Sequence, residues 1–258
     1  MEKINVIKVG GAVVEDQQQL SLLLKEFSAI EGRKVLVHGG GRRATKVAAQ
    51  LGIETQMVDG RRITDKAMLE VVTMVYGGLV NKNVVAQLQA EGINALGLTG
   101  ADINVIRSHK RPLKNDIDYG FVGDVDQADG NMLKTLIEAG IVPVMAPLTH
   151  DGKGNMLNTN ADTIASETAK ALAPYYDVTL TFCFEKKGVL SNPDDDDSVI
   201  PVITPELFRN YVADGTISGG MLPKIENSLA ALKAGVKQVV ITKADALGSQ
   251  TGTKILNS

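Results

Sequence analysis

The sequence predicts an α/β protein with a mainly parallel central sheet. Strand-like and helix-like segments alternate over nearly the whole chain of 258 residues, and this alternation favours parallel strands joined by helices. Two glycine segments, Gly10-Gly11 and Gly39–Gly41, each stand between an apolar run and a helical pattern. A chain of this length has room for one large domain or two modest ones.

The individual elements follow from hydrophobic periodicity and from turn signals. The expected strands are Ile4–Val9, Lys34–Val37, Asn94–Leu98, Val142–Ala146, Val178–Phe184, Gln238–Thr242 and, at an edge, Thr253–Leu256. The expected helices are Gln17–Ile30, Arg43–Leu51, Asp65–Tyr76, Leu79–Glu91, Asn131–Ala139, Asn160–Ala173, one from Pro205 and one from Pro223. Antiparallel hairpins are expected at Met57–Ile63, within Ile103–Val125 and around Asp151–Asn155. Ala173-Pro174 is the best candidate for a domain boundary.

Composition narrows the functional classes. The net charge of −3 gives no electrostatic reason to expect nucleic acid or an anionic membrane surface as a partner. No apolar run is long enough to span a membrane, and the start lacks a secretory signal pattern. The single cysteine, Cys183, fits a reducing cytoplasm. The three histidines show no metal-ligand spacing, so no metal site made by the protein is expected.

Two lysines stand where a cation needs an anionic partner. Lys8 lies inside the apolar run Ile4–Val9, where a lysine is seldom buried unless it is paired. Lys224 follows Pro223, which suits the first position of a helix, so the helix dipole would repel this cation unless an anion is bound. The N–H groups of glycine loops can approach an anion closely. Together these features predict one phosphoryl-transfer site.

Other interpretations of the same residues stay open at this point. Lys8 could extend to solvent from an edge strand, Lys224 could be solvated, and each glycine segment could be a tight turn. The P-loop pattern GxxxxGK[ST] does not occur, which disfavours a Walker-type ATPase. Gly39–Ala44 with Asp59 satisfies a dinucleotide-binding pattern and leaves an NAD-dependent oxidoreductase open. However, Asp59 stands in an Asp-Gly turn rather than at the end of a strand.

Two polar segments supply candidate partners for the cations and for a substrate. Asn160 is suited to cap a helix, which places Asp162 in the first helical turn. There its carboxylate could complement the helix dipole alone, or it could orient both lysines when the site is empty. Arg62 has the two-pronged guanidinium that suits a carboxylate; for Arg61 and Arg62 alike, exposure to solvent is the alternative.

In five segments the chain resembles the amino acid kinase family. The segments are Lys8–Gly11, His38–Gly41, Gly60–Thr64, Asn158–Asp162 and Gly219–Lys224. The last three in combination are similar to the branch of the family that phosphorylates N-acetylglutamate. The resemblance implies a two-lobed, three-layer αβα sandwich. Residues 1–174 would form the lobe for the acyl-amino acid and for dimerisation, and residues 175–258 would form the nucleotide-binding lobe.

The resemblance also implies roles for individual residues, with ATP and Mg²⁺ as cofactors. Lys8 and Lys224 would stabilise the transferring phosphoryl group, and Asp162 would orient both lysines. The substrate would be held by Gly40, Gly41, Arg62 and Asn158. The nucleotide site would be lined by Gly10, Gly11, Glu185, Thr216, Ile217, Ser218, Gly219, Gly220 and Met221.

Two departures from the family pattern leave the details open. Phe184–Gly188 stands where many relatives carry an aspartate, so the adenine and ribose contacts are expected to differ. Arg42 and Arg43 stand where neutral residues are expected, and they could serve a substrate with an additional carboxylate, such as N-succinylglutamate, or face solvent. Because the first strand begins so near Met1, the resemblance implies a homodimer with little arginine feedback. A non-catalytic amino-acid-sensing module is the alternative from another class.

Overall fold

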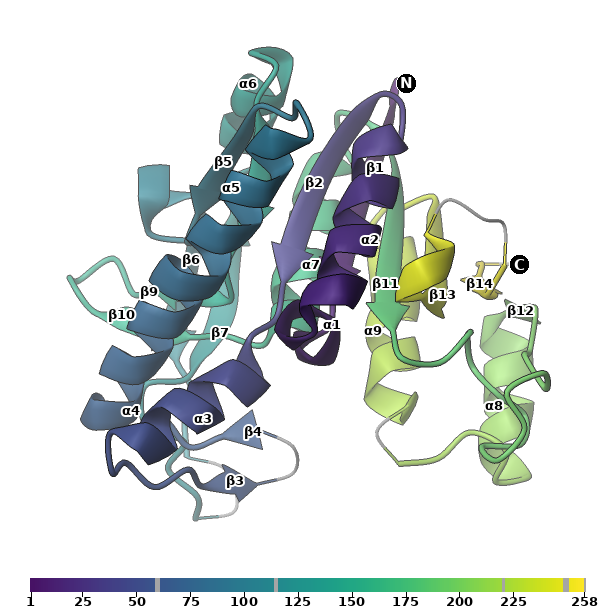
Figure 1. The fold of residues 1–258 in the computed structure, drawn as a ribbon. Coiled ribbons are helices and arrows are strands. Elements are labelled where there is room, and N and C mark those ends of the chain that lie inside the picture. Colours follow the sequence, from purple (N-terminus) through teal and green to yellow (C-terminus); the bar gives the residue numbers. More distant parts are fainter. Residues whose placement is uncertain (59–60, 114–115, 220, 248–250, 258) are drawn as a thin grey trace.

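In the part of the chain that the structure describes, the central sheet has eight strands, six of which run parallel to one another (Figure 1). The computed structural model describes residues 1–58, 61–113, 116–219, 221–247 and 251–257. In spatial order the strands are β12 (Val202–Ile203), β14 (Thr253–Ile255), β13 (Gln238–Lys243), β11 (Asp177–Phe184), β1 (Lys3–Val9), β2 (Arg33–His38), β8 (Val142–Met145) and β5 (Ala95–Leu98). β14 is antiparallel to β13, and β12 is parallel to β14.

Helices cover both faces of this sheet and confirm the three-layer prediction (Figure 1). Side chains that alternate along a strand enter two separate cores: Val35 and Val37 belong to one, and Leu36 belongs to the other. The first face carries α6 (Gly130–Glu138), α7 (Ala161–Leu172) and α9 (Met221–Lys233). The second carries α2 (Gln17–Ala29), α4 (Lys66–Val72) and α5 (Asn81–Ala90).

The remaining elements lie mostly towards the carboxyl ends of the parallel strands or along the outer edges. A second sheet has the order β10-β9-β6-β7, and β3 pairs with β4. These strands are β3 (Met57–Val58), β4 (Arg61–Arg62), β6 (Ile106–Lys110), β7 (Gly123–Ala128), β9 (Leu148–His150) and β10 (Met156–Asn158). The other helices are α1 (Gly11–Glu15), α3 (Gly41–Gln50), the π-helix η1 (Thr73–Val80), the 3₁₀ turns η2 (Asp102–Asn104) and η3 (Ala244–Ala246), and α8 (Pro205–Ala213).

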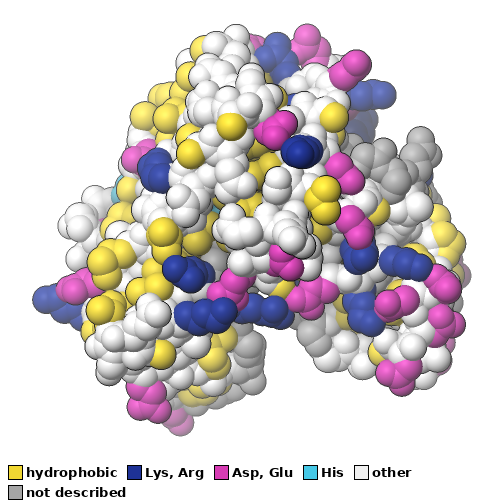
Figure 2. Space-filling view, viewed as in Figure 1, with side chains coloured by type: hydrophobic (Ala, Val, Ile, Leu, Met, Phe, Trp, Pro, Cys, Tyr) yellow, Lys and Arg dark blue, Asp and Glu magenta, His cyan; other side chains and the backbone are white. Residues whose placement is uncertain are grey.

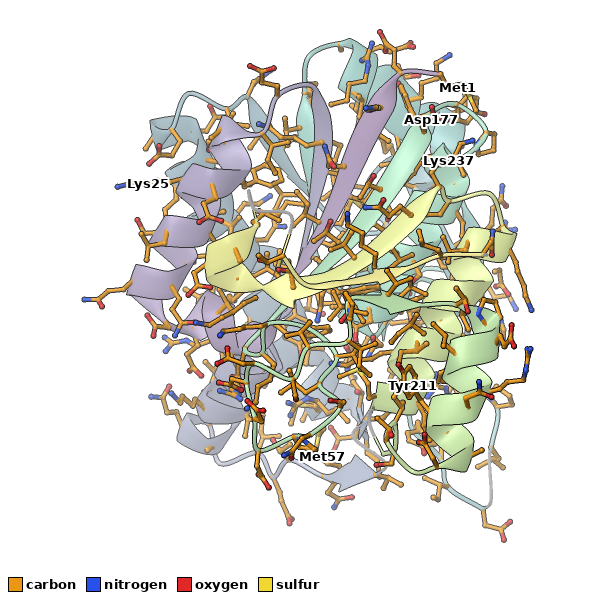
Figure 3. All side chains as sticks on the ribbon, turned by 90° about the vertical axis from the view of Figure 1, so that its right-hand side faces the viewer. Met1, Lys25, Met57, Asp177, Tyr211 and Lys237 are labelled. Carbon is orange, nitrogen blue, oxygen red and sulfur yellow. The ribbon has the colours of Figure 1, made fainter. Side chains whose placement is uncertain are left out.

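The amino ends and the carboxyl ends of the central strands lie at opposite ends of the molecule and carry different groups (Figure 3). At the amino end of β11, Asp177 lies 3.7 Å from the terminal amine of Met1 and 3.8 Å from Lys237 Nζ. Met57 lies at the opposite end of the molecule. Both glycine segments follow the carboxyl ends of β1 and β2, so ligand chemistry is expected at that opposite end.

Three sequence predictions about the elements are wrong. Asp65–Tyr76 and Leu79–Glu91 do not form two separate helices, because Gly77 and Gly78 stay helical within η1, which joins α4 to α5. Tertiary packing overrides the low helix propensity of glycine here, because η1 packs against α3 and β9 and continues the helix from α4 to α5.

The other two corrections concern the C-terminal third. β14 does not close the sheet, because β12 pairs on its outer side and is the true edge. A strand of only two residues gives no periodic signal in the sequence. Helix α9 begins at Met221, two residues before Pro223. The centre of the predicted hairpin, Asp59-Gly60, lies outside the described residues.

No helix in the described part of the chain is both long and apolar enough to cross a membrane. On the face shown in Figure 2, basic and acidic side chains are interspersed. The division into residues 1–174 and 175–258 stays a prediction. β1 and β11, which fall on the two sides of this division, pair along their whole length.

Candidate active site

Four side chains, those of Lys8, Asp162, Phe184 and Lys224, meet on the first face of the sheet, at the carboxyl ends of β1 and β11. Lys8 pairs with Phe182 across these parallel strands, so its side chain points the same way as Phe182 and Phe184. α7 packs against both strands and α9 packs against α7. The first turns of these two helices thereby bring Asp162 and Lys224 to the same end.

The central contact of this cluster is an ion pair between Lys8 and Asp162. Lys8 Nζ lies 2.6 Å from Asp162 Oδ1, and the two side chains are 9% and 19% exposed. Asn160 caps α7 as predicted, because its side chain accepts hydrogen bonds from the N–H groups of Asp162 and Thr163. The cap fixes the first turn of α7 and so fixes the carboxylate that pairs with Lys8.

Lys224 is held differently from Lys8. No carboxylate among the described residues lies within 4 Å of its Nζ, which instead stands 3.5 Å from the centroid of the Phe184 ring. Lys8 Nζ lies 5.2 Å from the same centroid. Burial lowers the pKa of Lys224, the charge of Asp162 raises it, and the charge of Lys8 lowers it again. Asp162 therefore contacts one lysine directly and acts on the other at longer range.

The two glycine loops pack backbone against backbone beside this cluster. A Cβ on Gly39 would lie 2.9 Å from Gly11 N, a distance at which something would have to shift. The N–H of Gly10 donates to Cys183 O and that of Gly39 donates to Val9 O. The N–H groups of Gly11, Gly40 and Gly41 have no acceptor in the part of the chain that the structure describes. These three are the donors available to a ligand.

A buried histidine supports the second glycine loop. His38 is fully buried, and its Nδ1 lies 2.8 Å from Gly39 O while Asn81 Nδ2 lies 3.1 Å from its Nε2. Burial lowers the pKa of His38 to about 4. The neutral ring can then donate through Nδ1 to the Gly39 carbonyl and accept through Nε2 from Asn81.

Two cavities open on either side of the glycine loops. Gly11 and Gly41 line both cavities, so the cavities meet there. Figure 2 shows the molecule hollowed between its two lower parts, with basic and acidic side chains at the hollow. Lys8 and Lys224 line the second cavity, next to the junction. Two ligands bound in these cavities would meet at the glycine N–H groups and the lysines.

The first cavity is suited to an acidic ligand. Of the described residues that line it, three are arginines (Arg61, Arg62 and Arg111) and none is a carboxylate, and Asn158 lies on its wall. Arg62 is 8% exposed, and its Nη2 donates to Gly41 O at 2.9 Å and to Thr45 Oγ1 at 2.8 Å. Arg62 thus lines the first cavity and also links the cavity wall to the glycine loop through its hydrogen bond to Gly41 O.

Other residues of the first cavity were not predicted from the sequence. Arg111 pairs with Asp124 through Nε, 3.1 Å from each carboxylate oxygen, and this contact lowers the pKa of Asp124. The ring of Tyr76 forms the cavity wall beside Gly40. A Cβ added to Gly40 would lie 2.8 Å from this ring. Neither residue belongs to a motif, so the sequence offered no signal for them.

The second cavity contains four of the nine residues predicted to line the nucleotide site. Gly10, Gly11, Glu185 and Met221 line it together with Phe184. Thr216, Ser218 and Gly219 precede α9 in the sequence but do not line the cavity, and the side chain of Ile217 is buried in the core. Gly220 lies outside the described residues. The nucleotide role of these residues stays a prediction.

Arg42 and Arg43 lie away from the first cavity. Arg42 Nη2 donates to Glu185 Oε1 at 3.0 Å, an exposed ion pair beside the second cavity. Arg43 lines a separate surface pocket together with Glu15 and Leu79. The structure therefore gives neither arginine a way to bind a distal carboxylate of an acyl group in the first cavity.

The protein's own side chains do not form a metal cage in the described part of the chain. No group of three or more His, Cys, Asp or Glu side chains there could hold an ion. A magnesium ion bound through one carboxylate and the phosphates of a nucleotide would fit, since Mg²⁺ usually keeps several waters and substrate oxygens. Asp162 and Glu185 are the acids beside the second cavity.

Comparison with known proteins decides the family. The model of the amino acid kinase family matches residues 3–243. The chain belongs to the amino acid kinase family. Within it, the acetylglutamate kinase of Phocaeicola vulgatus is 69% identical over 98% of each chain. The acetylglutamate kinase of Methanopyrus kandleri is 40% identical, over 97% of this chain and 99% of its own.

Solved structures agree with this member's fold. A protein of Streptococcus mutans superimposes with a TM-score of 0.79 at 31% identity and covers 99% of both chains. Carbamate kinase from Giardia lamblia, solved with AMP-PNP, gives a TM-score of 0.70 at 17% identity, which supports the fold alone. The comparisons give no support to an oxidoreductase, a sensing module or a succinyl substrate.

We predict that His38 makes the stability of this amino acid kinase depend on pH. Its folded pKa of about 4 lies below the ordinary 6.5, so the unfolded chain binds more protons between these values. The contribution of neutral His38 to the free energy of unfolding is therefore fully present above about pH 6.5 and is lost as the pH falls towards 4. At pH 4.5 the loss is about 2–3 kcal/mol.

Urea unfolding at pH 7 and pH 4.5 measures this loss, with His38→Gln as the matched variant. Because other groups titrate in both proteins, the quantity to compare is the difference between wild type and variant. Equal losses in the two proteins would show that His38 is not the titrating group.

Proposed function

We propose that the protein is an ATP-dependent kinase that phosphorylates the γ-carboxylate of N-acetyl-L-glutamate. The products are N-acetyl-L-glutamyl 5-phosphate and ADP, in an early step of arginine synthesis. Relatives named acetylglutamate kinase support this proposal over nearly the full chain. The single structural observation that carries it is the cluster of the Lys8–Asp162 ion pair and Lys224, in which both lysines line the second cavity next to the glycines that it shares with the first.

The first cavity suits the acyl-amino acid and the second suits the nucleotide. Arginines and Asn158 line the first, as a substrate with two carboxylates requires, and the lysines line the second, as a polyphosphate requires. Gly11 and Gly41 belong to both. The γ-carboxylate would reach the γ-phosphate of ATP at this junction, beside the free glycine N–H groups.

The chemistry asks for charge neutralisation and positioning. A carboxylate oxygen forms a bond to the γ-phosphorus while the bond from that phosphorus to the bridging oxygen breaks, and ADP leaves with the electron pair. No proton has to be removed, since the carboxylate is already ionised at neutral pH. Lys8 and Lys224 offset the negative charge that gathers on the transferring group, and Asp162 keeps Lys8 in place.

We also propose that the enzyme binds ATP with Mg²⁺ and works as a homodimer in the cytoplasm. Met74 and Leu79 on η1 are 55% and 40% exposed, and apolar side chains of this kind suit a protein interface.

The thiol of Cys183 is buried, and burial raises its pKa to about 12, as in an inert core cysteine. We further propose the division into a substrate lobe, 1–174, and a nucleotide lobe, 175–258.

A substrate comparison tests the reaction. We expect ADP release with N-acetylglutamate, and far slower release with glutamate or aspartate, because a free α-ammonium would face the arginines of the first cavity. Trapping the product with hydroxylamine should give a hydroxamate, which identifies a carboxyl phosphate. N-succinylglutamate belongs in the same series, and a clear preference for it would change the proposed acyl group. Absence of a hydroxamate with every substrate would contradict the proposed reaction.

Replacing either lysine should affect turnover more than binding. We expect Lys8→Met and Lys224→Met each to lower kcat by about 10²–10³ with smaller changes in KM, because the charges act mainly on the transition state. Lys34→Met is the matched control: this buried lysine donates to the carbonyls of Phe27, Ser28 and Ile30 at 2.7–3.0 Å. The control should lose stability and keep kcat, and near-normal kcat in either lysine variant would remove that lysine from the mechanism.

Replacing Arg62 should instead weaken binding of the acyl-amino acid. We expect Arg62→Ala to raise the KM for N-acetylglutamate and to leave the KM for ATP nearly unchanged, since a carboxylate clamp acts on ground and transition states alike. Arg62→Lys should fall in between, because it keeps the charge without the fork. Thermal melts of both variants show whether the lost bond to Gly41 O also affects folding. A change confined to the KM for ATP would reassign Arg62 to the nucleotide.

A further inference from the structure

Phe184 occupies an unusual position for an aromatic side chain. It ends β11 with its ring near two ammonium groups, 3.5 Å from Lys224 Nζ and 5.2 Å from Lys8 Nζ, measured to the ring centroid. The ring stacks on Phe182, with centroids 6.1 Å apart and planes at 8°. Both distances lie within the range in which a cation is attracted to the face of a ring.

Lys224 needs such a partner more than Lys8 does. Lys8 has the carboxylate of Asp162 at 2.6 Å, whereas no described carboxylate lies within 4 Å of Lys224 Nζ. Lys224 also stands in the first turns of α9, where the helix dipole disfavours a cation. The face of the Phe184 ring, 3.5 Å away, carries a negative potential that partly compensates this ammonium.

We infer that Phe184 is a positioning residue, and that its ring holds the Lys224 ammonium beside Lys8 in the orientation needed for phosphoryl transfer. This inference rests on the proposed function. An ammonium has three N–H donors, so a group that rests on a ring still has donors directed away from the ring. Those donors are free for the oxygens of the transferring phosphoryl group. The ring therefore directs the cation without using up its capacity to bind phosphate.

The stacked pair explains why the ring itself stays in place. Phe182 is 3% exposed in the first core and pairs with Lys8 across the strands. Phe184 lies two residues further along β11, on the same face. Stacking on a buried neighbour limits the rotation of the outer ring, so the orientation of Lys224 depends on the core of the sheet.

The test replaces Phe184 with mono-, di- and trifluorophenylalanine by site-specific incorporation. Fluorine withdraws electron density from the ring face and barely changes its size, so folding is preserved while the attraction weakens. We expect kcat to fall stepwise with the number of fluorines, to a total of about 5- to 30-fold, with little change in the KM for ATP. Phe184→Leu should give a loss at least as large as that of the trifluoro ring.

The same series at Phe27 is the matched control, because this buried ring also contacts a lysine, with Lys34 Nζ 5.2 Å from its centroid, but lies away from the site. It should leave kcat unchanged. An equal fall in both series, or a flat series at Phe184, would overturn the inference. So would a change confined to the KM for ATP.

A measurement without turnover separates this inference from the proposed function. Ring currents should shift the Cε-proton resonances of Lys224 upfield in the wild type, and the shift should vanish in Phe184→Leu; Lys224→Arg assigns the signal. Absence of the shift in an active kinase overturns the positioning role alone. If the shift is present but no N-acylglutamate is phosphorylated, the proposed function fails and the ring contact stands.

Discussion

The ion pair between Lys8 and Asp162 is the contact on which the site depends. A lysine near the carboxyl end of a central strand is costly to bury, and the carboxylate 2.6 Å away offsets that cost. The pair joins β1 to the first turn of α7, so the sheet and its covering helix are fixed relative to each other at the reacting end. Removing either partner would leave an uncompensated charge beside the core.

The site also depends on the close packing of its two glycine loops. Gly11 and Gly39 approach so closely that side chains are excluded between them. This contact leaves the N–H groups of Gly11, Gly40 and Gly41 facing the two cavities. The buried, neutral ring of His38 holds the second glycine loop in place through its contact with Gly39 O and is itself held by Asn81. The glycines, their unpaired N–H groups and the buried His38 ring thus form one surface that is open to ligands in both cavities.

Much of this site could be predicted from the sequence because its main parts are locally coded. Two lysines break local rules, since Lys8 stands in an apolar strand and Lys224 near the start of a helix, and such breaks point to function. The glycines at strand ends and the capped helix with Asp162 follow local rules, which made them recognisable. Phe184 breaks no rule, since an aromatic residue is ordinary in a strand. Its role depends on the register between β1 and β11, which no local pattern specifies. The continuous helix through Gly77 and the short strand β12 were missed for the same reason: distant packing decides them.

The pairing of β1 with β11 has a consequence for how the enzyme matures. Lys8 meets Phe182 and Phe184 only when the first strand of the chain pairs with one that is synthesised much later. Contacts between such distant segments form slowly, because the intervening loop must close first. An incompletely folded chain can hold intact glycine loops and helices and still lack the assembled lysine cluster. Catalytic activity regained after denaturation would therefore follow the closure of the central sheet, and not the earlier return of helical structure.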